Sequence, residues 1–325
     1  MTSKPMNAQT SGGGGILFFC ALLIAAAVAG YVLTGNSAKD EPKPETVRGA
    51  VKIHDSNVAG LHNVYRLGET LYTGSAPEEH GFDSLARLGV KTIISVDGAP
   101  PDVEAARSRG MRYVHLPITY SSVPRETVVA SVRAARELPG PIYLHCHHGK
   151  HRGPAAAVSL WRCLDKTVTA QQAVAAMKLI GTADRYQGLY DSVQNLTCPT
   201  ADELATAKGD LPESSHVPPL AKTMSEIDRI WDRVKKPAAD RNSTTISLQL
   251  TTTYDLAEQF REAARLADVT EAMQPGFEAI VSDLESLAET IKAELRDPAG
   301  ASPLRAEAVD RVNRRCDECH AKFRD

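Results

Sequence analysis

The chain has 325 residues, of which 42% are hydrophobic and 24% are charged, so most of it is expected to fold around packed cores. This length suits an anchor segment followed by two domains better than it suits one domain. A formal net charge of −3 with no basic tail excludes a general attraction to nucleic acid. Six cysteines are too few for a disulfide-stapled scaffold, and Cys163 and Cys198 are expected to be unpaired thiols, buried or at the surface.

An apolar run near the N-terminus predicts a membrane segment. Ile16 to Leu33 carry no charge and are just long enough to cross a bilayer as a helix. We expect residues 16–34 to be a retained, single-pass transmembrane anchor. The alternative is a signal peptide cleaved after Ala27-Val28-Ala29, although only Lys4 supplies a positive charge before the run. Both alternatives place the rest of the chain outside the cytoplasm, in the periplasm or an equivalent space.

Polar sequence flanks the apolar run, and an alternating pattern follows it. Residues 1–15 are predicted to be a flexible N-terminus and residues 35–50 a proline-rich, charged linker. In residues 51–199, short apolar strands are separated by helical segments, which predicts a mostly parallel central sheet with helices on both faces. The strands are expected at residues 65–73, 91–96, 111–118 and 141–145, and the helices at residues 81–88, 101–109, 126–137, 153–163 and 169–180.

The pattern changes after residue 199. Residues 200–219 have little apolar content and are predicted to be a linker. Residues 220–325 then show apolar side chains at helical spacing in four segments with short connections, which predicts an all-α four-helix bundle.

The most specific motif of the first domain lies directly after the predicted strand at residues 141–145. It reads His145-Cys146-His147-His148-Gly149-Lys150-His151-Arg152-Gly153. A loop that runs from a buried strand into a helix points backbone N–H groups inward, which binds an oxyanion and favours a thiolate at Cys146. The planar fork of Arg152 grips two phosphoryl oxygens. The motif predicts cleavage of a phosphate monoester through a phosphocysteine, and the alternative is a turn with an inert cysteine.

This loop resembles the HC-x2-G-x2-R signature of protein-tyrosine and dual-specificity phosphatases, and the stretches at residues 71–77 and 89–94 resemble the small dual-specificity type. The resemblance implies an α/β cysteine-phosphatase fold that needs no cofactor of its own. It implies that Cys146 is the nucleophile, that His145 supports the thiolate, and that Arg152 binds phosphate. The implied substrate-binding residues are His147, His148, Gly149, Lys150 and His151.

Two departures from the family's pattern concern the chemistry. Gly153 follows Arg152 where the family often has Ser or Thr, which predicts slow hydrolysis of the intermediate. The family's Asp general acid is also missing, since Ser121 lies near its expected place. We choose Asp97 as the general acid, and Asp102 or a histidine of the loop are the alternatives.

The loop is unusually basic, because His147, His148, Lys150 and His151 all lie within it. These side chains suit a substrate with more than one phosphate, such as an inositol phosphate or a phosphoinositide. The alternative is that they point outward and only raise the local potential.

A second motif, Cys316-Asp317-Glu318-Cys319-His320, lies near the end of the sequence. The pattern C-x-x-C-H is typical of covalent attachment of haem c, in which the two sulfurs form thioethers and the histidine binds the iron. The alternatives are a redox dithiol or half of a zinc site, although residues 220–325 contain no other Cys or His.

A helical bundle with CxxCHxxFR on its last helix resembles cytochrome c′ and its low-spin relatives. The resemblance implies that Met224, on the first helix, is the second axial ligand, and the alternative is a core methionine. Without that ligand the iron would be open to small gases.

Together these motifs predict a membrane-anchored, extracytoplasmic phosphomonoesterase coupled to a c-type cytochrome domain. Its expected partners are a phosphorylated protein or a small phosphate ester, a redox partner, and the membrane. The alternative is an electron-transfer or gas-sensing cytochrome whose phosphatase-like domain only binds a phosphorylated partner.

Overall fold

The computed structural model describes residues 47–207, 209–236, 242–296 and 303–323. The predicted anchor at residues 16–34, its possible cleavage site and most of the linker after it lie outside these residues. Within the described ranges, no helix is both long enough and apolar enough to traverse a bilayer.

The first domain is built on a six-stranded sheet with the strand order β1-β2-β3-β6-β4-β5. Strands β3, β6, β4 and β5 run parallel, as predicted, whereas β1 and β2 add an antiparallel edge that makes the sheet mixed. The strands are β1 (Ala50–Lys52), β2 (Tyr65–Leu67), β3 (Leu71–Gly74), β4 (Thr92–Ser95), β5 (Arg112–His115) and β6 (Ile142–His145).

Strand β6 is central, and all four of its residues are buried. Its last residue, His145, is in register with Gly74 at the end of β3 and with Ser95 at the end of β4. The segments that follow β4 and β6 therefore leave the sheet at the same edge, where ligands bind in open α/β sheets.

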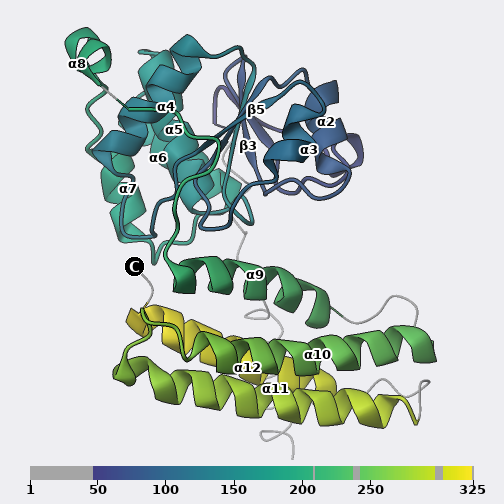
Figure 1. Ribbon diagram of the computed structural model, residues 1–325. Helices are drawn as coiled ribbons and strands as arrows, with labels where there is room; N and C mark the ends of the chain where they lie inside the picture. The colour runs from purple at the N-terminus through teal and green to yellow at the C-terminus, as the bar shows by residue number, and fades with distance from the viewer. Residues whose placement is uncertain (1–46, 208, 237–241, 297–302, 324–325) are drawn as a thin grey trace, which may run out of the picture. The chain divides into compact units, whose positions relative to one another are not determined.

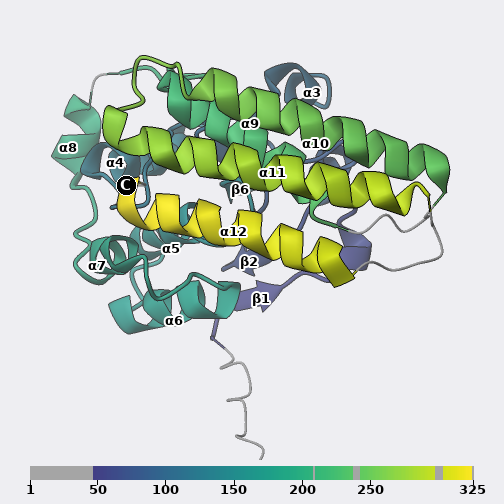
Figure 2. The ribbon, with the colours of Figure 1, turned by 90° about the horizontal axis from the view of Figure 1, so that it is seen from below.

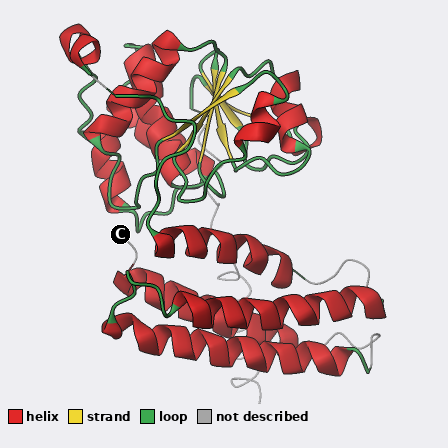
Figure 3. Ribbon diagram, viewed as in Figure 1, coloured by secondary structure: helices red, strands yellow, loops and turns green. Residues whose placement is uncertain are grey.

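Helices cover both faces of this sheet, as Figures 1 and 3 show. One face packs on α2 (Gly81–Arg87) and α3 (Val103–Arg107), through a core that includes Phe82 and Tyr113. The other face packs on four helices that share the larger core. These are α4 (Arg125–Glu137), α5 (Arg152–Leu164), α6 (Ala170–Ile180) and α7 (Gln187–Gln194). A short 3-10 helix spans Asp55–Asn57.

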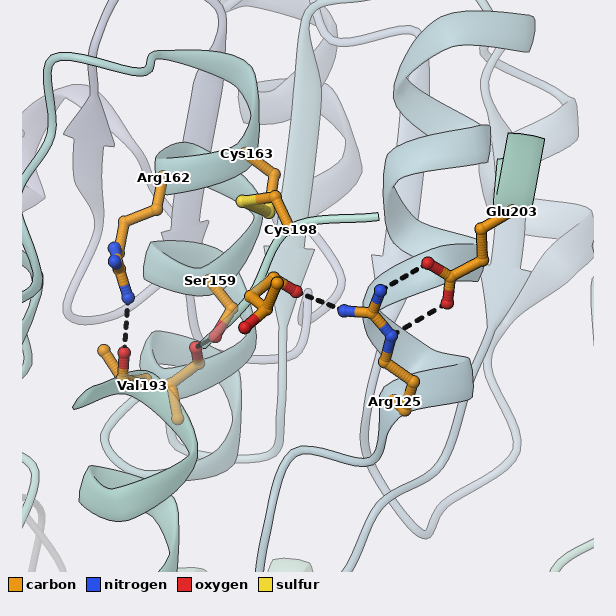
Figure 4. Close-up of a disulfide and its surroundings, with 9 residues drawn as sticks. Arg125, Ser159, Arg162, Cys163, Val193, Cys198 and Glu203 are labelled. Atoms are coloured by element: carbon orange, nitrogen blue, oxygen red, sulfur yellow. Dashed lines mark hydrogen bonds and ion pairs between the residues drawn. A yellow bond between two sulfur atoms is a disulfide. The ribbon is translucent and has the colours of Figure 1, made fainter. Parts of the chain in front are cut away.

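The segment predicted as a linker at residues 200–219 is instead packed on this domain over much of its length. It forms α8 (Ala201–Thr206), and two of its apolar side chains, Leu204 and Leu211, are buried in the larger core. Glu203 of α8 also accepts a hydrogen bond of 2.8 Å from Arg125 Nε, which Figure 4 shows. Two well-placed leucines are enough to dock a segment whose composition is otherwise polar.

Cys163 and Cys198, which we expected to be unpaired, form a disulfide across a separation of 35 residues. Figure 4 shows the bond joining α5 to the segment that leads into α8. Their spacing in sequence gave no sign of pairing because the chain between them folds into α6 and α7 before it returns.

The C-terminal region is the predicted helical bundle, and Figure 2 shows its long helices running alongside one another. Its core includes Trp231, Phe260, Leu284 and Val312, one from each helix. The helices are α9 (Pro219–Val234), α10 (Ser243–Ala263), α11 (Gln274–Glu294) and α12 (Pro303–Phe323), with a 3-10 turn at Glu271–Met273.

Candidate active site

The loop between β6 and α5 has the tight path that its glycines predicted. Gly149 has a φ of +68°, and a Cβ atom there would lie 2.2 Å from the carbonyl carbon of Gly74. A Cβ atom on Gly153 would lie 2.8 Å from the amide nitrogen of Cys146. Only glycine fits at these two positions, so the loop closes around Cys146 at the start of a 13-residue helix.

Cys146 is 3% exposed, lies at the end of the central strand, and carries a free thiol. His145 before it is also buried, between the rings of Tyr113 and Tyr143. Burial lowers the pKa of His145 to about 4, so its ring is neutral at pH 7. The Nδ1–H group is 3.2 Å from the carbonyl oxygen of Cys146, and Nε2 is 3.3 Å from the hydroxyl group of Tyr113. His145 therefore orients the backbone of Cys146 and is not a positive partner for a thiolate.

Arg152 is 6% exposed and is held on three sides. Its Nη2 donates a 2.9 Å hydrogen bond to Asp97 Oδ1, and its Nη1 lies 3.4 Å from the carbonyl oxygen of Ile118. The ring of Tyr120 stacks on the guanidinium group at 4.4 Å. Because Nε is buried and has no hydrogen-bond partner, the guanidinium keeps donor capacity for an oxyanion.

Asp97 follows β4 and enters the same site, 1% exposed. Burial alone would raise its pKa, but nearby positive charge, that of Arg152 above all, outweighs burial and leaves the pKa below its ordinary value. The resting group is therefore a carboxylate, whereas a general acid must hold a proton. The observed contacts make Asp97 a positioning residue for Arg152, and its role as the acid stays a prediction.

The other candidates for the acid have different roles in the structure. The Asp102 carboxylate caps α3 by accepting a 2.9 Å hydrogen bond from the amide of Ala105. Ser121 is hydrogen-bonded to Thr119 through their hydroxyl groups, 2.6 Å apart.

The basic side chains of the loop do not converge on one point. Lys150 is exposed. The ring of His151 lies 4.6 Å from that of Tyr186, which in turn lies 5.0 Å from Tyr120. His148 faces Asp232 of α9, and His147 lies between Asp97 of the site and Asp228 of α9. The rings of Tyr120, Tyr186 and His151 thus form an aromatic wall beside Arg152. This arrangement suits an aromatic substrate better than a substrate with several phosphates.

The C-x-x-C-H motif lies on α12. Cys316 and Cys319 are free thiols, three residues apart on one helix, and both are partly buried. Burial raises the pKa of Cys316 to about 12 and also raises that of Cys319. Cys319 Sγ lies 3.6 Å from the position of a Cβ atom on Gly276, so the sulfur packs against this glycine of α11.

Met224 lies on α9 and packs against the bundle core. Trp231 Nε1 of the same helix donates a 3.0 Å hydrogen bond to Asn313 Oδ1 of α12. Figure 1 shows α9 and α12 running in opposite directions. Met224 lies seven residues before Trp231, and His320 lies seven residues after Asn313. Because the rise per residue is the same in both helices, Met224 and His320 lie at the same height along the bundle.

Comparisons with known proteins agree with the assignment of the loop. Residues 52–189 match the family model described as DSP-PTPase phosphatase fused to NAD+ Kinase. The dual specificity protein phosphatase TpbA of Pseudomonas aeruginosa strain UCBPP-PA14 is 32% identical over 132 residues, which are 39% of this chain and 57% of that protein. TpbA of strain PAO1 is 33% identical over 93 residues, 28% of this chain and 42% of that protein. The chain thus spans about half the length of the curated relatives it matches.

Solved structures of TpbA from P. aeruginosa are also similar to this chain. One has a TM-score of 0.38 at 27% identity and covers 46% of this chain and 90% of its own. A TpbA variant in complex with phosphotyrosine has a TM-score of 0.39 at 25% identity, with coverage of 46% and 91%. The family model and the sequence relatives match the part of the chain that carries the observed loop, and they support a cysteine-dependent phosphatase site there.

Proposed function

We propose that this chain is an extracytoplasmic, membrane-anchored phosphomonoesterase whose phosphatase domain is coupled to a c-type cytochrome bundle. The observation that carries the phosphatase part is the free thiol of Cys146, enclosed by a loop that starts α5 and leads to the guanidinium of Arg152. The backbone N–H groups of residues 147–152 and Arg152 hold the phosphoryl oxygens. The sulfur of Cys146 attacks phosphorus, the ester oxygen leaves, and water then hydrolyses the phosphocysteine.

The substrate class follows from the ionised state of Asp97, the predicted general acid. An alkoxide leaving group needs a proton, whereas a phenolate, with a pKa of about 10 for tyrosine, leaves more easily without one. Tyr120 and Tyr186 supply ring surface beside Arg152. We therefore favour an aryl phosphate, such as a phosphotyrosine side chain, over an inositol phosphate.

Turnover of a phenolic phosphate ester by the full chain tests this proposal. The wild type should hydrolyse the ester, and Cys146→Ser should abolish turnover because serine has no thiolate. Cys163→Ser, which removes a cysteine far along α5 from the loop, is the matched control for loss of a sulfur and should keep turnover under conditions where it is folded. Unchanged turnover in Cys146→Ser would rule out the catalytic role of the loop.

The cytochrome part of the proposal rests on α12. Cys316 and Cys319 would hold haem c through thioether bonds, and His320 would bind the iron, with Met224 at its level on α9. Bound haem supplies one-electron transfer or binding of a small gas. The two free, partly buried thiols fit covalent attachment of this group.

The haem test uses protein from a host with haem-maturation machinery. The wild type should show a Soret band that survives denaturation, because thioether bonds are covalent. Cys316→Ser with Cys319→Ser should lose the band under those conditions, and Met224→Ala should shift it if Met224 binds iron. A denatured wild type that releases all its haem contradicts covalent attachment.

The compartment is the third part of the proposal. The Cys163–Cys198 disulfide favours an oxidising space, which agrees with the apolar run at residues 16–34 and with haem attachment outside the cytoplasm. A membrane-impermeant protease added to spheroplasts should degrade residues 51–325. Protection of these residues until the membrane is broken would place them inside.

The second candidate function is an electron-transfer or gas-sensing cytochrome whose phosphatase domain only binds a phosphorylated partner. The ionised state of Asp97 favours it, since the site then holds no proton for a poor leaving group. Acid quench of the enzyme during turnover distinguishes the two, because a trapped phosphocysteine on Cys146 is formed only by an active phosphatase.

A further inference from the structure

Two histidines of the phosphatase loop meet carboxylates of helix α9. His148 Nε2 lies 2.9 Å from Asp232 Oδ2, and His147 Nε2 lies 3.8 Å from Asp228 Oδ2. The two imidazole rings are 4.3 Å apart at 75°. One nitrogen of each histidine and one oxygen of Asp232 all lie within 4.8 Å of one another.

His147 is the least satisfied member of this group. Its side chain is 11% exposed, and both ring nitrogens are buried without a hydrogen-bond partner. The nearest carboxylate oxygens, on Asp97 and Asp228, are each 3.8 Å away, which is too far for a hydrogen bond.

Asp232 is suited to complete such a site. Its carboxylate lies 2.9 Å from His148 Nε2 and forms an ion pair with Lys235. Its side chain is 26% exposed and that of His148 is 39% exposed, which leaves an entry path for an ion.

We propose that His147, His148 and Asp232 bind a divalent transition-metal ion, which holds helix α9 to the phosphatase loop. Two imidazoles with a carboxylate suit Zn²⁺, Ni²⁺ or Cu²⁺, whereas Mg²⁺ and Ca²⁺ prefer oxygen ligands throughout. Ligand atoms of tetrahedral zinc are about 3.4 Å apart, so the groups need to move only slightly. Asp228, beside His147, or water takes the fourth position.

Zinc titration of the full chain by calorimetry tests the site. The background carries Cys146→Ser, Cys316→Ser and Cys319→Ser, which removes the free thiols of the described residues as competing ligands. We expect about one strong equivalent of Zn²⁺ and, with Co²⁺, the visible absorption of a tetrahedral complex. Asp232→Asn should weaken binding at least about tenfold, since even partners outside the first coordination sphere contribute that much.

Asp310→Asn, an exposed aspartate on α12, is the matched control and should bind as the background does. Hydrogen exchange of residues 219–234 should slow on adding Zn²⁺, but not in Asp232→Asn. Equal zinc affinity in Asp232→Asn and Asp310→Asn overturns the site, and unchanged exchange in α9 despite tight binding overturns its holding role. These readouts do not use turnover, so they stand or fail separately from the phosphatase proposal.

Discussion

The buried pair of Asp97 and Arg152 gives the sharpest test of the site. Asp97 Oδ1 and Arg152 Nη2 are 2.9 Å apart, and both side chains are buried. At an effective dielectric constant of 20, this separation corresponds to a gross attraction of about 6 kcal/mol, most of which offsets the desolvation of the two charges. Removing one partner of a buried pair typically costs about 3–5 kcal/mol. Asp97→Asn keeps a hydrogen-bond acceptor, so we expect a loss near the lower end, about 3 kcal/mol.

A phosphate ion should reverse much of this loss. In the wild type the carboxylate of Asp97 repels an oxyanion that Arg152 attracts, whereas in Asp97→Asn the guanidinium has lost its only ion-pair partner among the described contacts. Urea unfolding with and without inorganic phosphate should therefore show a larger stabilisation by phosphate in the variant. Asp102→Asn is the matched control, because asparagine caps a helix as well as aspartate does. Equal stability and equal phosphate response in Asp97→Asn and the wild type would refute the reasoning.

The difference in unfolding free energy between the wild type and Asp97→Asn should change with pH in one direction. The pKa of Asp97 is lower in the folded chain than its ordinary value, so the pair contributes its full stability above about pH 4. The contribution is lost as the pH falls through the folded pKa. The difference in unfolding free energy between the wild type and Asp97→Asn should therefore be constant near neutral pH and shrink in acid.

Three further predictions concern the loop, the disulfide and the aromatic wall. Gly149→Ala should abolish phosphate binding, because its Cβ atom would overlap Gly74. Gly89→Ala, also at positive φ but with open space around it, should lower the free energy of unfolding by only about 1 kcal/mol. Isothermal titration with phosphate and urea unfolding test both variants. Cys163→Ser should lower the unfolding free energy by about 3–4 kcal/mol, as expected for a closed loop of 35 residues, and added reductant should then have no further effect on that variant. Tyr186→Ala should raise KM for an aryl phosphate more than for an alkyl phosphate, and an equal rise for both would contradict stacking.

The sequence predicted the parallel part of the sheet because its strands are short apolar runs separated by helices. It did not predict β1, whose three residues are intermediate or exposed and carry no apolar periodicity. Helix α8 was missed for a related reason, since Leu204 is its only buried residue. Elements that pack through one or two side chains leave too weak a pattern to distinguish from a linker.

The same contrast holds within the site. Cys146, Arg152 and the glycines were predictable because their chemistry depends on spacing along one loop. The pairing of Asp97 with Arg152 spans 55 positions and depends on β4 and β6 ending at the same edge. A general acid must be protonated before it can act, and the positive charge of Arg152 shifts Asp97 toward its ionised form. Only the folded contact, which lowers the pKa of Asp97, favours its ionised form.

The site also contains buried polar atoms that have no hydrogen-bond partner. Among the described residues, Asp97 Oδ2, both ring nitrogens of His147 and Arg152 Nε are buried without a hydrogen bond. Each buried polar atom without a partner costs about 1–3 kcal/mol of folding free energy, so packing alone does not explain why these atoms lie together at this site. The donors among them suit an oxyanion at Cys146, and the histidine nitrogens suit a cation at its rim. These unpaired atoms therefore lower the stability of the site in the free protein, and a ligand that bonded to them would recover part of that free energy.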